Sequence, residues 1–270
     1  MNRIFNFSRF GRYLAYDLRN ARNNAGFTLL VYGLAPIFFF FFYEICSLVF
    51  SGYFGNFGLG WRIPFLFVLM LVCFTLLPAR LYGRVTDRRY GTEFLMLPAS
   101  TFEKFLSMVI VTAVVMPLCL SLMLLVSDTL LGLVFGALYG EPLLFMDNAV
   151  LFGVDPLAVA GDSLYVNFFA SFLVGWWIWI LFFILGAVFF KKSKVAKTLL
   201  SYLLISLVLG VTFSAILLKT QTGTAEAFFT KDIDIQTAVN FLNVISNAVN
   251  FLISAVLLGL IYWRLRALKH

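Results

Sequence analysis

The chain has 270 residues, of which 62% are hydrophobic and 12% are charged, and its formal net charge is +7. Soluble domains hold about 45–50% apolar and about 25% charged residues, so a soluble fold of this length has too little interior for this much apolar surface. The positive charge occurs in short clusters between apolar runs rather than on one continuous face, which argues against nucleic acid as a partner. We therefore predict an all-α integral membrane protein, with residues 1–270 forming a single transmembrane domain.

Residue types that carry catalysis or bind metals are scarce. Each of the three cysteines lies inside an apolar run, without the clustered spacing of a disulfide framework or a metal site. The one histidine is the last residue, and the chain has neither a Gly-x-x-x-x-Gly-Lys phosphate loop nor a Gly-x-Ser-x-Gly elbow. We expect no catalytic, cofactor-binding or metal site and no enzyme activity, so any ATPase that drives this protein is a separate chain.

Residues 1–25 are expected to form an amphipathic helix at the cytosolic membrane surface. The arginines are spread along the segment, unlike the short basic head of a signal peptide. At about 100° per residue the apolar side chains form one stripe that faces away from Arg9, Arg12 and Arg19. Such a helix lies in contact with anionic membrane lipid; a merely basic tail of the first span is the alternative. The stripe comprises Phe7, Phe10, Leu14 and Leu18.

Six apolar stretches approach or exceed the length of about 20 residues that a bilayer-spanning helix needs. We place these spans at about 27–50, 63–82, 105–126, 168–190, 198–218 and 238–263. An apolar run after Asp128 is too short to cross, and it is either a helix extension or a re-entrant piece. The outer segment 141–163 is acidic but apolar between its charges, and re-entrant, membrane-lying and gating roles all stay open.

Basic residues are concentrated on one side of this layout. Of the 20 lysines and arginines, 17 fall in segments on the amino-terminal side, and only Arg62, Lys219 and Lys231 fall on the other. Lysine and arginine are enriched in cytosolic loops. We therefore predict cytosolic amino and carboxy termini and a cytosolic connector at 84–104.

The connector contains helix start and stop signals. Glu93 falls in the first turn after a Gly-Thr turn, where a carboxylate complements the helix dipole. The apolar turn 94–97 ends at Pro98, which disfavours helix for the residue before it. Ser100 and Glu103 then have the spacing of a capping box. We predict a short helix, a break and a new helix start.

The apolar residues of this connector need a surface to contact. One interpretation places them in the lipid headgroup layer or against the protein's own helix ends. The other places them in a groove of a partner protein. The residues concerned, with their flanking charge and proline, are Glu93, Phe94, Leu95, Met96, Leu97 and Pro98.

Eight connector positions form a further pattern, namely Arg89, Gly91, Thr92, Leu95, Leu97, Pro98, Ser100 and Glu103. This pattern resembles the connector after the second span in the membrane (permease) subunits of exporter-type (type-2) ATP-binding-cassette transporters, and the layout of a surface helix and six spans is similar too. The resemblance implies that residues 93–98 form a coupling helix on a separate ATPase subunit. It also implies a homodimer or heterodimer of permease subunits in the bacterial cytoplasmic (inner) membrane. In that family re-entrant outer helices commonly precede the sixth span, whereas the long outer segment here follows the third.

The last expected span carries a polar stripe. Gln236, Asn240, Asn243, Asn247, Asn250 and Ser254 recur every three or four residues and therefore share one helix face. Hydrocarbon cannot hydrogen-bond an amide, so this face is expected to turn inward. It either makes hydrogen bonds between helices or lines a hydrated path or the seam between two copies. The candidate lining residues are Asn243, Asn247, Asn250 and Ser254.

These patterns favour the membrane-spanning subunit of an ATP-driven exporter that moves its substrate outward. The alternative is a non-transporting membrane scaffold or sensor that recruits a soluble partner through the connector. An intramembrane enzyme is disfavoured because the spans lack histidine and paired carboxylates. The abundant aromatic residues are compatible with a lipidic or amphiphilic substrate and equally with a plain lipid-facing surface, which we favour.

Overall fold

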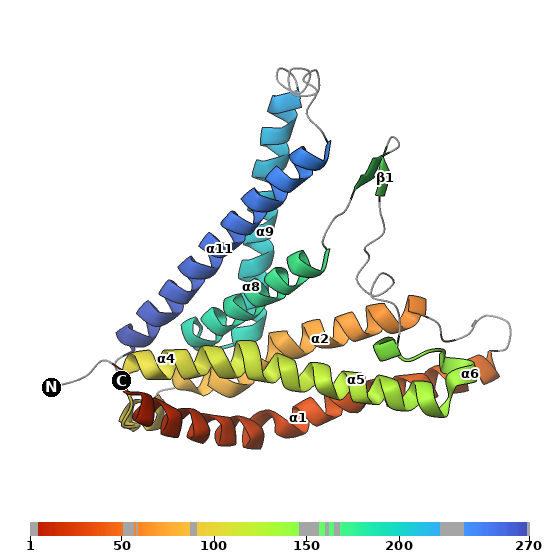
Figure 1. The fold of residues 1–270 in the computed structure, drawn as a ribbon. Helices are drawn as coiled ribbons and strands as arrows, with labels where there is room; N and C mark the ends of the chain where they lie inside the picture. The colour runs from red at the N-terminus through yellow and green to blue at the C-terminus, as the bar shows by residue number, and fades with distance from the viewer. Residues whose placement is uncertain are drawn as a thin grey trace.

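The computed structural model describes residues 5–50, 57, 59–86, 91–145, 157–159, 162–164, 168–221 and 235–268. Its regular elements are helical apart from one short antiparallel hairpin (Figure 1). The chain order is α1 (Phe7–Val49), α2 (Leu59–Tyr82), η1 (Gly83–Thr86), α3 (Gly91–Met96), α4 (Thr101–Ile110), η2 (Val111–Val115), α5 (Met116–Val134), α6 (Gly136–Tyr139), η3 (Leu143–Phe145), β1 (Leu157–Val159), β2 (Asp162–Leu164), α8 (Phe168–Phe189), α9 (Lys194–Gln221) and α11 (Ile235–Ala267).

Five helices in the described part of the chain are long and apolar enough to cross a membrane. They are Phe7–Val49, Gly60–Thr86, Thr101–Val134, Lys194–Thr212 and Ser246–Ala267. The expected fourth span corresponds to α8, an apolar helix of 22 residues whose side chains are described from Leu173 to Phe189. The predicted all-α class is confirmed, and the chain is a multi-pass membrane protein.

The surface helix and the first span, which we expected as two elements, are one continuous helix in the structure. Nothing in residues 23–26 interrupts the hydrogen-bond ladder of α1, and Pro36 is the only proline inside it. Figure 1 shows α1 bending along its length, as expected where proline removes a ladder hydrogen bond. Leu14 and Leu18 of the apolar stripe pack against the protein core, whereas Phe7 is 81% exposed. The stripe is therefore largely a packing face within the protein.

The larger core cluster lies where α1, α2, α4, α5, α8 and α11 meet. Small residues on α1, such as Ala25 and Gly33, face its neighbours and let the helix axes approach closely. A Cβ atom built on Gly33 would lie 2.7 Å from the Cβ of Met123 on α5. α8 approaches α9 in the same way at Gly186, where an added Cβ would collide with Thr198.

The third span is longer than expected. α4, the π-helical turn η2 and α5 form a continuous helical run from Thr101 to Val134, which carries the helix past Asp128. The run after Asp128 was expected to be either a helix extension or a re-entrant piece. In the structure it extends α5 to Val134, and the short helix α6 follows. Within η2 the Thr112 hydroxyl donates to the Met108 carbonyl at 2.6 Å, and π turns of this kind are frequent at functional sites in helices.

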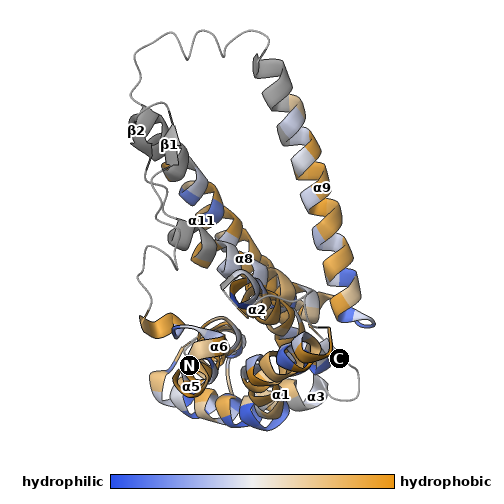
Figure 2. Ribbon diagram, turned by 90° about the vertical axis from the view of Figure 1, so that its right-hand side faces the viewer, coloured by the Kyte–Doolittle hydropathy of each residue, from blue (hydrophilic) through white to orange (hydrophobic). Residues whose placement is uncertain are grey.

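α9 and α11 diverge from α1, α2 and α5 toward one end of the molecule (Figure 1). Figure 2 shows α9 standing apart from the other helices with a largely apolar surface. Its exposed side chains include Leu203 and Leu207, which in a bilayer contact lipid. Away from the end toward which α9 and α11 diverge, the start of α1, the start of α4 and the end of α11 lie together (Figure 1). We call this part of the molecule the connector end.

Candidate functional site

The connector has the predicted order of a helix, a break and a new helix. The six-residue helix α3 is followed by a bend at 97–99, and α4 begins two residues later. Within the bend the Ala99 N–H donates to the Leu97 carbonyl at 2.8 Å. Pro98 has no N–H with which to extend α3. The connector is thus a compact turn between two helices.

Ser100 and Glu103 form the predicted capping box. The Ser100 hydroxyl oxygen accepts a hydrogen bond from the Glu103 N–H at 3.2 Å, and Glu103 Oε2 accepts one from the Ser100 N–H at 2.8 Å. The two bonds satisfy backbone donors that the first turn of a helix otherwise leaves unpaired. The predicted helix start is therefore confirmed.

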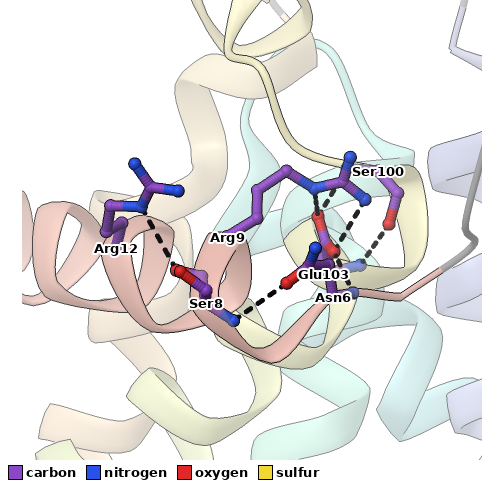
Figure 3. A network of polar contacts seen from close by, with 6 residues as sticks. All are labelled: Asn6, Ser8, Arg9, Arg12, Ser100 and Glu103. Carbon is purple, nitrogen blue, oxygen red and sulfur yellow. Dashed lines mark hydrogen bonds and ion pairs between the residues drawn. The ribbon is translucent and has the colours of Figure 1, made fainter.

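The Glu103 carboxylate also binds the beginning of α1 (Figure 3). Arg9 Nε donates to Oε2 and Arg9 Nη2 to Oε1, both at 2.8 Å, and the Asn6 N–H donates to Oε1 at 2.9 Å. Glu103 is 0% exposed, and the paired, two-pronged geometry with arginine is the strong form of a charge-assisted hydrogen bond. One buried carboxylate therefore joins α1, the bend and α4.

Lys104, the next residue, fixes the short helix. Its Nζ donates to the Phe94 carbonyl at 2.7 Å and lies 5.2 Å from the centre of the Phe94 ring. The Phe94 ring is half-buried and packs against the core. The end of α3 is thereby held against α4, which matches the interpretation in which connector side chains contact the protein's own helix ends.

The remaining apolar side chains of the connector divide between two environments. Leu97 is half-buried, whereas Pro98 is exposed and Met96 is 85% exposed. The side chains of Glu93 and Leu95 lie outside the described part of the structure, although their backbone belongs to α3. Met96 and Pro98 form the part of the expected coupling surface that this chain leaves uncovered.

A second polar cluster beneath the connector was not predicted. Asp17 on α1 is buried, and its Oδ2 accepts hydrogen bonds from the Tyr82 and Ser107 hydroxyls, both at 2.6 Å. These contacts join α1, the end of α2 and α4. Asp17 lies on the same side of α1 as the buried Tyr13 and Ala21, so its position on the apolar face was the available signal.

The loop between α8 and α9 supports the connector from another side. Lys194 Nζ donates to the Gly83 carbonyl, and the Thr86 hydroxyl donates to the Phe190 carbonyl at 3.4 Å. Gly83 and Thr86 are the first and last residues of η1. The turn before α3 is therefore attached to the second half of the chain as well as to α1.

A buried ion pair lies at the end of the molecule opposite the connector. Arg62 Nη2 donates to Asp128 Oδ1 at 2.7 Å, and both side chains are almost fully buried. The Tyr139 hydroxyl and the Leu143 N–H also donate to this carboxylate, at 2.6 and 2.7 Å. The pair locks the start of α2 to the end of α5 and the loop that follows it. The sequence contained one signal for this pair: Arg62 precedes the second expected span and Asp128 follows the third, which puts two opposite charges at the same expected membrane edge.

The polar stripe of α11 is only partly covered. Ser254 is buried, and its hydroxyl donates to the Asn250 carbonyl of the same helix at 2.9 Å. Asn250 is half-buried and Asn247 is exposed, and in the part of α11 whose side chains are described neither asparagine side chain makes a hydrogen bond. The side chain of Asn243 lies outside the described residues. Hydrogen bonding to other helices of this chain is therefore not observed at Asn247 and Asn250.

These positions share a face with the residues that pack α11 onto the bundle. Leu257, Ile261 and Leu265 are buried and continue the three- or four-residue spacing of the stripe. The face is buried from Ser254 to Leu265 and exposed at Asn247. Figure 1 shows α11 diverging from α4 and α5 away from the connector end. The stripe is thus the inner face of α11 beyond the point where the packing stops.

Comparison of the chain with family models, curated proteins and solved structures finds no match.

Proposed function

We propose that this chain is the membrane-spanning subunit of an ATP-driven exporter in the bacterial cytoplasmic (inner) membrane. In this proposal six spans cross the bilayer, both termini and the connector are cytosolic, and two permease subunits work with separate ATPase subunits. The observation that carries the proposal is the exposed Met96 at the end of a short helix that Lys104 holds through the Phe94 carbonyl. An exposed apolar side chain on a rigid support is the usual form of an anchor in a partner's groove.

The contacts around the connector supply a route for force. Movement of α3 is passed to α4 through Lys104 and Phe94, because the ammonium group binds the end of α3 directly. Glu103 passes the same movement to α1 through Arg9. Closure of ATPase subunits on the connector would therefore rock α1 and α4 together, which is the rigid-body type of transition expected for alternating access.

The test uses Met96→Asp, with Met96→Leu as the matched control. The tagged chain is purified from its native membranes, co-purifying chains with a phosphate loop are identified by mass spectrometry, and ATPase activity of the complex is measured. We expect Met96→Asp to insert normally but to reduce recovery of the ATPase about tenfold, as for loss of an interface anchor. Met96→Leu keeps an apolar side chain and should retain the complex.

Two results would contradict the proposal. If no phosphate-loop protein co-purifies but Met96→Asp still releases another soluble protein, the chain is the scaffold or sensor that we hold as the alternative function. If Met96→Asp and Met96→Leu recover the same partner equally, the connector is not the docking surface. Met96 is exposed, so a folding defect is not expected to obscure either result.

A further inference from the structure

A pocket of about 440 Å³ lies between the first turns of α1 and the bend after α3. Met96, the proposed docking anchor, does not line it, although Pro98 borders both the pocket and the uncovered coupling surface. Its lining residues are Arg9, Arg12, Tyr13, Tyr16, Leu97 and Pro98.

The lining combines an apolar wall with positive charge. Two tyrosine rings with Leu97 and Pro98 supply carbon surface, and the two arginines project from neighbouring turns of α1 (Figure 3). The charge of Arg9 is balanced by Glu103. Arg12 donates through Nε to the Ser8 carbonyl at 3.3 Å, and within the described residues no carboxylate lies within ion-pair distance of it. Among the described residues, the charge of Arg12 is therefore the one in the pocket that no carboxylate balances.

Two properties of the pocket select its occupant. A guanidinium group has the planar fork that binds two oxygens of a phosphate, and the adjoining rings offer an apolar surface for a neighbouring glycerol or acyl segment. The pocket also lies on the basic side of the molecule, where α1 carries further exposed arginines. Anionic lipid is concentrated at such basic membrane surfaces.

We propose that this pocket binds the headgroup of one anionic phospholipid, with the phosphate on Arg12 and the glycerol region against Tyr16, Leu97 and Pro98. This inference goes beyond the proposed function and holds whether the connector binds an ATPase or another protein. Because Leu97 and Pro98 form part of the wall, a bound lipid contacts the bend directly and restricts its movement. The pocket thus makes the connector sensitive to the lipid composition of the membrane.

The test measures lipid binding to the full-length chain by native mass spectrometry in detergent. The probes are dioleoyl-phosphatidylglycerol, which is anionic, and dioleoyl-phosphatidylcholine, which is zwitterionic. We expect tighter binding of phosphatidylglycerol, and we expect Arg12→Gln to weaken that binding about fivefold, the effect of one arginine near a lipid surface. Arg19→Gln is the matched control, because Arg19 is exposed on the same helix and does not line the pocket; it should bind as the parent chain does.

A second variant separates the pocket from surface charge in general. Tyr16→Ala removes part of the apolar wall without changing charge, and it should also weaken binding of phosphatidylglycerol. Equal losses in Arg12→Gln and Arg19→Gln, or no preference of the parent chain for phosphatidylglycerol, would overturn the lipid site. Displacement of the lipid by inorganic phosphate alone would also overturn it, because the site would then recognise an anion without its apolar part.

Discussion

Glu103 combines a local role with a long-range one. It completes the capping box with Ser100, and it accepts hydrogen bonds from Arg9 and Asn6, which are more than ninety residues away in sequence. The local role was predictable, because the spacing of Ser100 and Glu103 alone defines a capping box. The ion pair was not, because nothing in a single sequence indicates which of the five arginines before the first span approaches this carboxylate.

Replacement of Glu103 should weaken the connector end strongly. Glu103→Ala leaves the N–H groups of Arg9, Asn6 and Ser100 without their shared acceptor, and because Arg9 is partly exposed, the cost is that of lost hydrogen bonds to a charged group, about 2 kcal/mol. The measurement is the midpoint of thermal unfolding in detergent, which we expect to fall by several degrees. Glu44→Gln is a suitable control, since Glu44 makes no hydrogen bond within the described structure. An unchanged midpoint in Glu103→Ala would show that the network does not stabilise the protein.

The same limit on prediction from the sequence applies to Asp17 and to the pair of Arg62 and Asp128. Each is an ionisable group whose partners come from other helices. Their burial follows from sequence periodicity in the case of Asp17 and from opposite charges at one membrane edge in the case of the pair. Their hydrogen-bond partners depend on how the helices pack, which periodicity does not specify.

At the level of elements, helix positions were more predictable than helix limits. Hydropathy located each long apolar helix, because about 20 apolar residues are needed to cross a bilayer. It did not predict that α1 would continue from the amphipathic segment into the first span, nor that α5 would pass Asp128 to end at Val134. At Asp128 the polar residue finds partners on α2 and in the segment after α5, so α5 need not end where the hydropathy falls. At the junction in α1 the polar residues are exposed, Asn24 donates to Asn20 one turn earlier in the same helix, and no proline interrupts the helix.

The inner face of α11 gives a prediction at this scale. Asn247→Leu combined with Asn250→Leu should leave the unfolding midpoint of the solubilised chain nearly unchanged, because neither side chain makes a hydrogen bond in the described structure. If the face lines a path or a seam between copies, coupled ATPase activity of the complex should fall about tenfold, within the usual range of coupling energies. Val244→Leu with Val249→Leu, also exposed on α11, is the control. A large drop in the midpoint with normal activity would favour hydrogen bonds between helices instead.

At the level of the whole molecule, the connector is held by contacts from both halves of the chain. Arg9 of α1 binds Glu103, and the Phe190 carbonyl between α8 and α9 accepts a hydrogen bond from Thr86. The distribution of charge predicts that this end of the protein lies in the cytosol. Sidedness is therefore the property on which the proposed function depends most directly.

Cysteine labelling tests this sidedness. Met96→Cys and Leu144→Cys introduce exposed thiols at opposite ends of the molecule, in a background with Cys46→Ser and Cys119→Ser that removes the half-buried and the exposed native thiol. A membrane-impermeant maleimide added to intact cells should label Leu144→Cys alone, and after lysis it should label both. Labelling of Met96→Cys in intact cells would place the connector outside and would refute the exporter proposal.

The unbroken length of α1 has a mechanical consequence. Its 43 residues extend about 64 Å at about 1.5 Å per residue, roughly twice the hydrocarbon thickness of about 30 Å. A tilt of about 10° around the middle of such a rod displaces its first turn by about 5–6 Å, close to one helical pitch. Since Asn6 and Arg9 hold Glu103, α4 is carried with that displacement. In the proposed exporter, α1 would therefore act as a lever that converts a small change of its inclination in the bilayer into a step of molecular size at the bend after α3.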